Sequence, residues 1–210
     1  TKRPAVVTAG LAFAKESNRQ DQFFVINFNN YVTPGLPSEV EFSDDLQLLR
    51  SALYMGIPVG QTALYDAIIV GLKHLKKGSQ SKKTLIVVSD GGDNVSKTSQ
   101  AEVLDKIRAS QATIYTVGLF SEDDPGRNPG VLQKMAHLSG GEYFNPPQLD
   151  DVIPVFHKIA MDIRHRYTIT YAPDPNLDPD KVPDRSIRVV AQAEKYKKLI
   201  VHTRTSYSFR

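Results

Sequence analysis

The apolar positions along the first 165 residues fall into two patterns that alternate along the chain. Short runs in which nearly every residue is apolar, such as 85–88 and 113–119, are typical of strands buried on both faces. Between these runs, apolar residues recur every three or four positions, as on the inner side of an amphipathic helix. Alternating strands and helices predict an α/β domain with a doubly wound, mostly parallel sheet and right-handed crossovers. The expected strands are 23–28, 84–88, 113–119 and 142–144, with at best an edge strand in 31–40, and the expected helices are 4–17, 43–54, 64–75, 98–110, 129–138 and one that ends near 164.

The pattern changes to strict alternation beyond residue 165. Apolar and polar residues alternate in 167–171, 187–191 and 199–203, which is typical of strands with one buried and one exposed face. We therefore expect two parts: a domain over 1–165, and a C-terminal antiparallel β extension over 166–210 that packs on it.

Residues 84–94, TLIVVSDGGDN, are the stretch around which the domain is organised. The apolar run stops at Ser89 and Asp90, and Gly91 and Gly92 then allow a sharp turn. Asp90 is thereby placed at the carboxyl end of a central strand, which is the edge of an open α/β sheet where ligands bind.

Thr62 is the second residue expected at this edge. Residues 55–62, MGIPVGQT, form a loop that leads into a helix, so Thr62 lies at a helix N-terminus on the same rim as Asp90. A hydroxyl and a carboxylate are hard oxygen ligands, suited to Mg²⁺, Mn²⁺ or Ca²⁺. The same residues also fit structural roles, with Thr62 as a helix N-cap and Asp90 as a turn residue before glycine. These residues alone favour neither interpretation.

Composition excludes several classes of site. The chain has no cysteine, so it contains no disulfide, thiol nucleophile or zinc–thiolate site. No apolar run approaches the roughly 20 residues that span a bilayer. The net charge of +3 is uneven, because residues 181–210 carry +6 and the first 180 carry −3. We interpret the basic residues as protection against edge-to-edge strand pairing, since nucleic-acid binding needs a denser basic patch interleaved with aromatic residues.

Other polar residues are weaker candidates for a site. Residues 174–180 place an oxygen at every second position, as in a calcium loop, but proline and arginine replace the glycine and glutamate that such loops need. The five histidines lack zinc-site spacing. We expect Asp66 to serve the first turns of its helix, and Asp93 and Asn94 to orient the loop after Asp90.

Two segments resemble parts of a known family. GQTALYDAI at 60–68 and TLIVVSDGGDN at 84–94 resemble the second and third loops of the von Willebrand factor type A domain. The order of strands and helices around them also matches, over nearly the whole chain.

The C-terminal residues resemble a particular bacterial group within that family, the VWFA-related acidobacterial domain proteins. That group usually has glycine before the last tyrosine, where this chain has Ser206, so the final turn is expected to differ. The segments that carry the resemblance are RYTITY at 166–171, RSIRV at 185–189 and VHTR at 201–204, followed by Tyr207.

The resemblance implies a Rossmann-like fold and a role in protein binding. In the family, a metal-ion-dependent adhesion site lies at the carboxyl rim of the sheet. This implies that Thr62 is the threonine ligand and Asp90 the acid of the third loop, often acting through water. The ion would be Mg²⁺, or else Mn²⁺ or Ca²⁺, and a carboxylate of the protein partner would complete its shell. The resemblance also implies a secreted bacterial adhesion module, extracellular or in the cell envelope, that is not an enzyme.

The chain departs from the family in one respect. The family's first loop, Asp-x-Ser-x-Ser, follows the first strand and precedes the first helix, and this sequence contains no such motif. The chain begins inside that helix, so it looks like a piece of a longer polypeptide. We therefore expect a sheet that lacks a middle strand unless another segment fills the gap, and weak or absent metal binding by this piece alone.

Two other functions stay open. An enzyme would use Asp90 as nucleophile or metal ligand for Mg-dependent phosphoryl transfer or hydrolysis. Against it, the sequence offers no partner acid two residues away, no phosphate-binding lysine loop and no Ser/His/Asp constellation. The other alternative is a metal-independent structural scaffold whose rim site is no longer used.

Overall fold

The computed structural model describes residues 2–56, 60–120, 125–170, 184–195 and 199–208. Its elements follow the predicted order over the first 165 residues. The helices are α1 (Arg3–Glu16), α2 (Leu46–Tyr54), α3 (Leu64–Leu75), α4 (Gln100–Ala109), α5 (Pro129–Ser139), the 3₁₀ turn η1 (Leu149–Asp151) and α6 (Val152–His165). The strands are β1 (Ile26–Phe28), β2 (Val32–Pro34), β3 (Thr84–Ser89), β4 (Thr113–Gly118), β5 (Tyr143–Phe144), β6 (Asp184–Ser186) and β7 (Ser206–Ser208).

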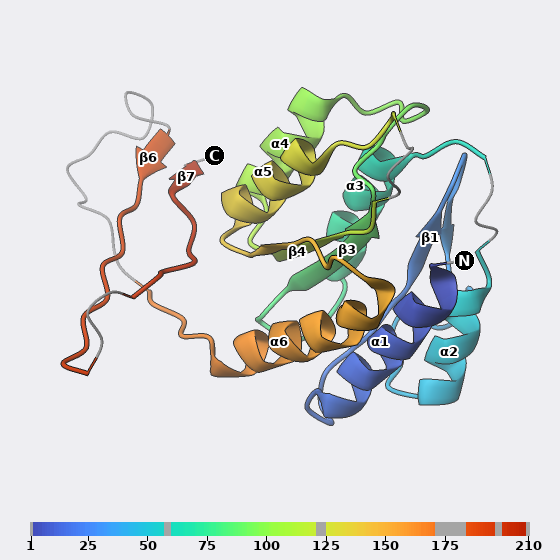
Figure 1. Ribbon diagram of the computed structural model, residues 1–210, viewed down its shortest axis with the longest axis horizontal. Helices are drawn as coiled ribbons and strands as arrows, with labels where there is room; N and C mark the ends of the chain where they lie inside the picture. The colour runs from blue at the N-terminus through green and yellow to red at the C-terminus, as the bar shows by residue number, and fades with distance from the viewer. Residues whose placement is uncertain (1, 57–59, 121–124, 171–183, 196–198, 209–210) are drawn as a thin grey trace.

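A parallel sheet forms the middle layer, and helices cover both of its faces (Figure 1). Strands β3, β4 and β5 pair in that order and run parallel, with Leu85 opposite Ile114 and Thr116 opposite Tyr143. Helices α3, α4 and α5 pack on one face, α1 and α6 on the other, and α2 lies against α1. The predicted doubly wound α/β fold is confirmed. Among the described residues, no helix is both long and apolar enough to cross a bilayer.

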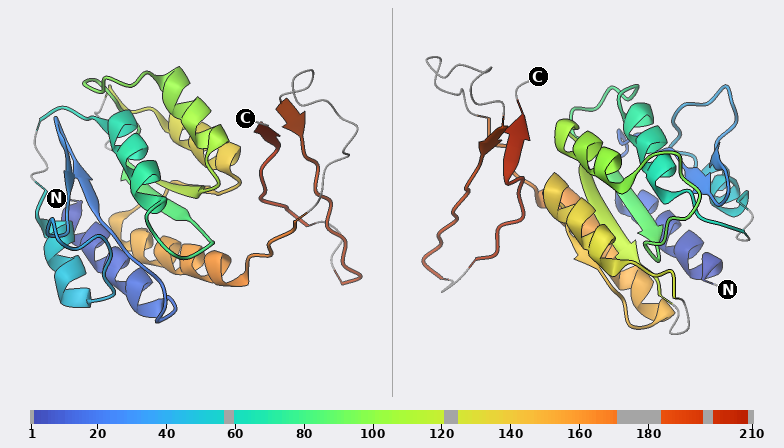
Figure 2. Two further views of the ribbon diagram at one scale, coloured as in Figure 1. Left: turned by 180° about the vertical axis from the view of Figure 1, so that it is seen from behind. Right: turned by 90° about the horizontal axis from the view of Figure 1, so that it is seen from above.

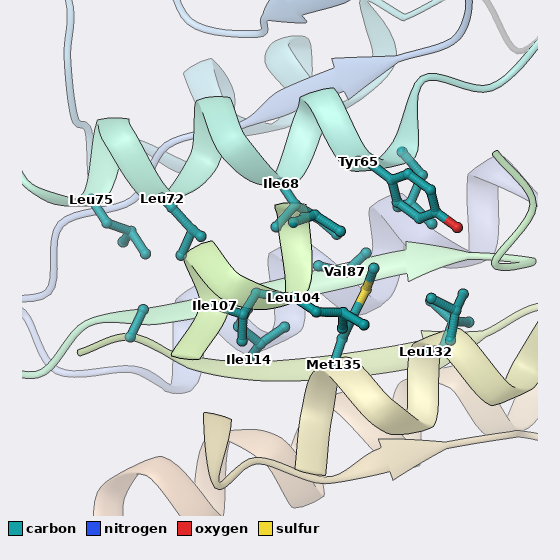
Figure 3. Close-up of a cluster of buried hydrophobic side chains, with 14 residues drawn as sticks. Tyr65, Ile68, Leu72, Leu75, Val87, Leu104, Ile107, Ile114, Leu132 and Met135 are labelled. Carbon is teal, nitrogen blue, oxygen red and sulfur yellow. The ribbon is translucent and has the colours of Figure 1, made fainter. Parts of the chain in front are cut away.

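Strand β4 is the central strand of this sheet. Ile114 packs with side chains of α3, α4 and α5, in the cluster that Figure 3 shows between helices and sheet. Its neighbours Tyr115 and Val117 pack on the opposite face, with α1 and α6. All three side chains are fully buried. Successive residues of a strand point to opposite faces, so burial on both faces explains the continuous apolar run.

Helix ends follow the signals in the sequence. Ser99 caps α4 in a capping box with Glu102. Asn128 caps α5 ahead of Pro129, and Gly140 ends that helix in the left-handed conformation with a φ of 78°. These termini lie where the sequence predicts them.

The start of α2 differs from the prediction. The sequence predicts a helix from residue 43, but the helix starts at Leu46 with Asp45 as its N-cap, because the Asp45 carboxylate accepts hydrogen bonds from the N–H groups of Gln47 and Leu48. Ser43 instead forms an isolated antiparallel bridge with Phe23. The predicted strand 23–28 is regular only over its last three residues, in β1.

The C-terminal extension also differs. Its described part contains one antiparallel pair, β6 with β7, and no strand in 167–170, 187–191 or 199–203. An alternating sequence becomes a strand only when its apolar side is covered, and Tyr167 and Ile169 are 91% and 72% exposed. Antiparallel pairing is confirmed, but the prediction of three strands at those positions is wrong. The calcium-loop candidate, 174–180, lies outside the described residues.

Strands β1 and β2 form a separate antiparallel ribbon beside the parallel sheet (Figures 1 and 2). The edge strand predicted within 31–40 is therefore present as β2. In the described part of the chain, β1 pairs with no strand of the parallel sheet. A cavity of about 730 Å³ lies between β1 and β3 instead. The expected gap in the middle of the sheet is present.

Candidate functional site

The carboxyl ends of β1 and β3 meet at one rim of the domain. The loop before α3 is fastened to the end of β1 by two hydrogen bonds. Gln61 N donates to Asn30 Oδ1 at 2.6 Å, and Ala63 N donates to Asn29 O at 2.8 Å. This loop therefore lies at the carboxyl end of β1.

The same loop is also fastened to the loop after β3. Thr62 N donates to Asn94 Oδ1 at 2.8 Å, and Asn94 N donates back to Thr62 O at 3.1 Å. Tyr65 N, in the first turn of α3, donates to Asp93 Oδ2 at 2.9 Å. The predicted orienting roles of Asp93 and Asn94 are confirmed, and segments 60–68 and 84–94 lie together at the rim.

Thr62 is not the N-cap of α3. That position is held by Ala63, which forms no side-chain cap, so the interpretation of Thr62 as a plain N-cap is wrong. Thr62 is half-buried and borders the cavity between β1 and β3. Its hydroxyl is therefore not used in capping the helix.

Asp90 lies directly after β3 and borders the same cavity as Thr62. Its Oδ1 accepts a hydrogen bond from Gly92 N at 3.0 Å, and its carbonyl oxygen accepts one from Asn128 N at 3.0 Å. Gly91 has a φ of +80°, and a Cβ at that position would lie 2.2 Å from Asn128 O. The turn therefore requires glycine, and Asp90 does act as a turn residue. Asp90 forms no ion pair among the described residues.

Asp66 lies in the first turn of α3, as expected. Its carboxylate accepts hydrogen bonds from the backbone N–H groups of Lys97 at 2.9 Å and Thr98 at 3.0 Å. It therefore also joins α3 to the end of the loop after β3. Burial raises the pKa of Asp66, but the hydrogen bonds from Thr98 and Lys97 outweigh burial and hold that pKa below its usual range.

Thr62 and Asp90 supply one hydroxyl and one carboxylate at this rim. Hard divalent cations accept both kinds of oxygen, but need about six or more oxygen ligands in all. The described residues contain no cluster of three or more His, Cys, Asp or Glu side chains that would hold a metal ion. One hydroxyl and one carboxylate are oxygens of the kind that a hard cation accepts, but two ligands are fewer than a full shell needs.

Sequence reasoning missed residues that hold the rim together. Asn30 accepts from Gln61, and Ser96 Oγ accepts from Asp66 N at 3.1 Å. These contacts join residues 31 and 30 positions apart, so no local motif marks them. The one sequence feature that could have identified Asn30 and Ser96 as rim residues is their position in polar segments that follow predicted strands.

Comparison with known families identifies the fold. A family model of the von Willebrand factor type A domain matches residues 6–156, which is more than half of the chain. No curated protein matches the chain.

Several solved structures are similar to this chain. A von Willebrand factor type A protein from Catenulispora acidiphila is 15% identical with a TM-score of 0.66, and the match covers 77% of this chain and 38% of that one. An aerotolerance-related membrane protein from Bacteroides fragilis is 14% identical with a TM-score of 0.61, over 78% of this chain and 89% of that one. Proximal thread matrix protein 1 from the mussel byssus, with a zinc-occupied MIDAS motif, is 16% identical with a TM-score of 0.60, over 78% and 43%.

The similarity at these identities concerns the fold, and the first of these proteins is much longer than the matched part. The family match rests on the sequence itself and covers the parallel sheet, its helices and the rim. The chain therefore belongs to the von Willebrand factor type A domain family, whose members are generally non-enzymatic interaction modules.

Proposed function

We propose that this domain binds a protein partner through the carboxyl rim of its sheet, as a non-enzymatic adhesion module. The proposal rests mainly on one observation, that Thr62 and Asp90 both border the cavity between β1 and β3 and lie on loops at the same rim. The reciprocal hydrogen bonds between Thr62 and Asn94 support it, because they fix the two loops relative to each other. Membership of a family of interaction modules is consistent with this role.

We assign Thr62 and Asp90 as the ligands that this chain contributes to a divalent cation. Their hard oxygens favour Mg²⁺, with Mn²⁺ or Ca²⁺ as alternatives. Gly92 N–H orients the carboxylate of Asp90, and Asn94 fixes the backbone that carries Thr62. When bound, the ion would offer an open position to a carboxylate of the protein partner. The zinc-occupied MIDAS motif of the byssus protein, which has the same fold, supports a metal at this rim.

The proposed cation is expected to bind weakly to residues 1–210. Two side-chain ligands leave most of the coordination shell to water. A partner carboxylate would add another oxygen, so metal and partner are expected to strengthen each other's binding.

We also propose a division of the chain and a location for it. Residues 1–165 would form the binding domain, and 166–210 an extension packed on it. The Arg204 guanidinium supports this packing, because it donates to the carbonyl oxygens of Ala112 at 3.0 Å and Arg108 at 3.3 Å. A byssus matrix protein and a membrane protein among the similar structures are consistent with an extracellular or cell-envelope location.

Titration with Mn²⁺, followed by the electron paramagnetic resonance signal of the free ion, tests the metal assignment. We expect a dissociation constant on the order of 10⁻³ M for the unmodified chain. Thr62→Ala and Asp90→Asn should each abolish binding. Asp44→Asn is the matched control, since Asp44 is an exposed carboxylate near the start of α2, and it should leave binding unchanged. Binding that persists in both rim variants would refute the assignment.

A further inference from the structure

The C-terminal extension carries a short hairpin whose two edges differ. Strands β6 and β7 pair with each other and with no other strand in the described part of the chain. Strand β7 lies beside α4, whereas β6 lies on the side of the hairpin that is away from the domain (Figures 1 and 2). The outer edge of β6 is therefore not covered by the domain.

Backbone groups of β6 and of the residues that follow it point to this outer edge. Ile187 N donates to Thr205 O at 2.7 Å, in the register of the β6–β7 pair, so the odd-numbered residues turn their backbone groups toward β7. Successive residues alternate in direction, so the N–H and C=O groups of Ser186, Arg188 and Val190 point away from β7. Within the described part of the chain, no hydrogen bond occupies the N–H of Arg188 or Val190. The outer edge can therefore pair with a further strand.

The side chains of this segment alternate between a half-buried and an exposed face. Ile187 and Val189 are half-buried, whereas Ser186, Arg188 and Val190 are exposed. Residues of a strand point alternately to opposite faces, so 186–190 already has the side-chain pattern of one strand in a sheet. A strand added at the outer edge would extend both faces and place its own side chains beside those of 186–190.

Exposed apolar side chains gather on the extension. Scattered single apolar residues are normal on a protein surface, but a concentration of them marks an interaction site. Among the described residues, six large apolar side chains are at least 65% exposed, and four of the six lie in the extension, namely Tyr167, Ile169, Val190 and Ile200. This concentration indicates that another molecule covers part of the extension.

The charge of the extension indicates what kind of segment binds there. Residues 181–210 carry a net charge of +6, and the first 180 residues carry −3. Arg188 lies in the middle of the exposed face and forms no ion pair among the residues that the structure describes. Two copies of this edge would bring like charges together, which destabilises strand pairing. The same charge favours a strand that carries acidic side chains.

We propose that the outer edge of β6 and its continuation, residues 186–190, binds an extended acidic segment of a partner protein and adds it to the hairpin as a third strand. Acidic and apolar residues alternate in that segment. The acidic ones lie on the exposed face beside Arg188, and the apolar ones on the half-buried face beside Ile187 and Val189. A partner stretch of about five residues, roughly 17 Å long, matches 186–190. This surface does not use the rim of the sheet, so it is an interaction site separate from the one proposed above.

Amide hydrogen exchange, measured residue by residue by NMR, tests the proposal. The probe is a synthetic peptide of about eight residues in which Val and Glu alternate. We expect exchange of the Ser186, Arg188 and Val190 amides to slow by about tenfold or more when the peptide binds. Exchange of the Ile187 amide should not change, because it already bonds to Thr205. Fusion of the peptide after residue 210 by a Gly/Ser linker raises its effective concentration, and a fusion without protection would overturn the proposal.

Backbone methylation of the peptide shows whether a strand is added. In a paired strand, the N–H groups of alternate residues point toward the neighbouring strand. Methylation of either the Glu nitrogens or the Val nitrogens should therefore abolish protection, and methylation of the other set should not. Equal protection by both methylated peptides would show contact without strand pairing and would overturn the proposal.

A charge reversal tests the role of Arg188. Arg188→Glu should weaken binding of the Val/Glu peptide by at least about tenfold at low salt, and should allow a peptide of alternating Val and Lys to bind instead. Arg50→Glu is the matched control, because it changes the net charge equally at an exposed position of α2, on the far side of the domain from the hairpin (Figure 1). Equal weakening in both variants would mean that net charge alone attracts the peptide, which contradicts the proposal.

Two other occupants of this edge would overturn the proposal. Equal protection by a DNA oligonucleotide would show a surface for polyanions in general. A dimer mass by light scattering, with protection that grows with protein concentration alone, would identify a second copy of the chain as the occupant. Measurements in EDTA separate this proposal from the metal assignment, because strand addition needs no metal and should persist whether or not Mn²⁺ binds at the rim.

Discussion

Thr62 and Asn94 are 32 positions apart, yet each donates its backbone N–H to an oxygen of the other. One acceptor is the side-chain oxygen of Asn94 and the other is the carbonyl oxygen of Thr62. The Asn94 side chain and one backbone bond therefore both help to fix the loop with Thr62 against the loop that follows Asp90.

Asn94→Ala should loosen the rim. The variant removes Asn94 Oδ1, the acceptor of the Thr62 N–H, so we expect the free energy of unfolding to fall by about 1 kcal/mol. The Thr62 amide should also exchange faster, which NMR detects directly. Asn145→Ala is the control, because Asn145 is an exposed amide on the loop after β5 and should have little effect. Unchanged exchange at Thr62 would show that the backbone bond alone holds the loop.

Gly91→Ala and Gly130→Ala should change stability in opposite directions. Gly91 has a positive φ, and a Cβ there would clash with Asn128 O at 2.2 Å, so we expect a loss of about 1–3 kcal/mol or more. Gly130 lies in the first turn of α5, where the nearest atom to a new Cβ is 3.6 Å away. Alanine favours the helix there by up to about 1 kcal/mol. Urea denaturation of both variants measures the two effects, and a change of the same sign in both would contradict this account of the turn.

Asp66 should make stability depend on pH in the acid range. Hydrogen bonds from Thr98 and Lys97 hold the pKa of Asp66 below the ordinary value of about 3.9, despite burial. A group whose pKa is lowered on folding contributes stability above its unfolded-state pKa, and this contribution is lost as the pH falls through the folded-state pKa. Asp66→Asn should therefore destabilise the domain at pH 7, and its difference from the unmodified chain should shrink below about pH 4. Urea midpoints from pH 7 to pH 3 measure this, and a constant difference would exclude ionisation of Asp66 as the cause.

The elements that the sequence predicts well are those whose signals are local. The apolar run that ends at Asp90, the start of α4 near Ser99 and the end of α5 at Gly140 each reflect burial or backbone geometry within a few residues. Asp90 and Thr62 could be placed on one rim because parallel strands in a wound sheet end on the same side. The sheet topology, and no single motif, therefore predicts that Thr62 and Asp90 lie on the same rim.

Tertiary contacts decided the points that the sequence left open or predicted wrongly. Asp66 has the sequence position of a first-turn acid, but it accepts from Lys97 and Thr98 about 30 residues away. Tyr167 and Ile169 alternate as in a strand, but no surface covers them, so no strand forms there. Local patterns report what a segment is able to form, and the neighbouring segments determine what it does form.

Arg204 should hold the C-terminal extension against the domain. Its guanidinium donates to the carbonyl oxygen of Arg108, near the end of α4, and to that of Ala112, just before β4. Arg204→Ala should therefore release β7 from α4, and we expect limited proteolysis within 166–210 to become several-fold faster. Arg188→Ala, at an exposed position in the same extension, is the control. Equal cleavage of both variants would argue against packing of 166–210 on the domain.

A phosphatase assay distinguishes a binding module from an enzyme that uses Asp90. Phosphoryl transfer needs cations and donors that surround the phosphate, and a nucleophilic acid with a firmly bound metal beside it. At this rim, Asp90 is followed by two glycines, and the described residues contain no cluster of three acids or histidines. We therefore expect no hydrolysis of p-nitrophenyl phosphate above background with Mg²⁺ in excess. Hydrolysis that disappears in Asp90→Asn but persists in Asp44→Asn would replace the adhesion proposal with an enzymatic one. A rim that only binds a partner would not cleave the phosphate ester, so its Asp90 would have no effect on hydrolysis.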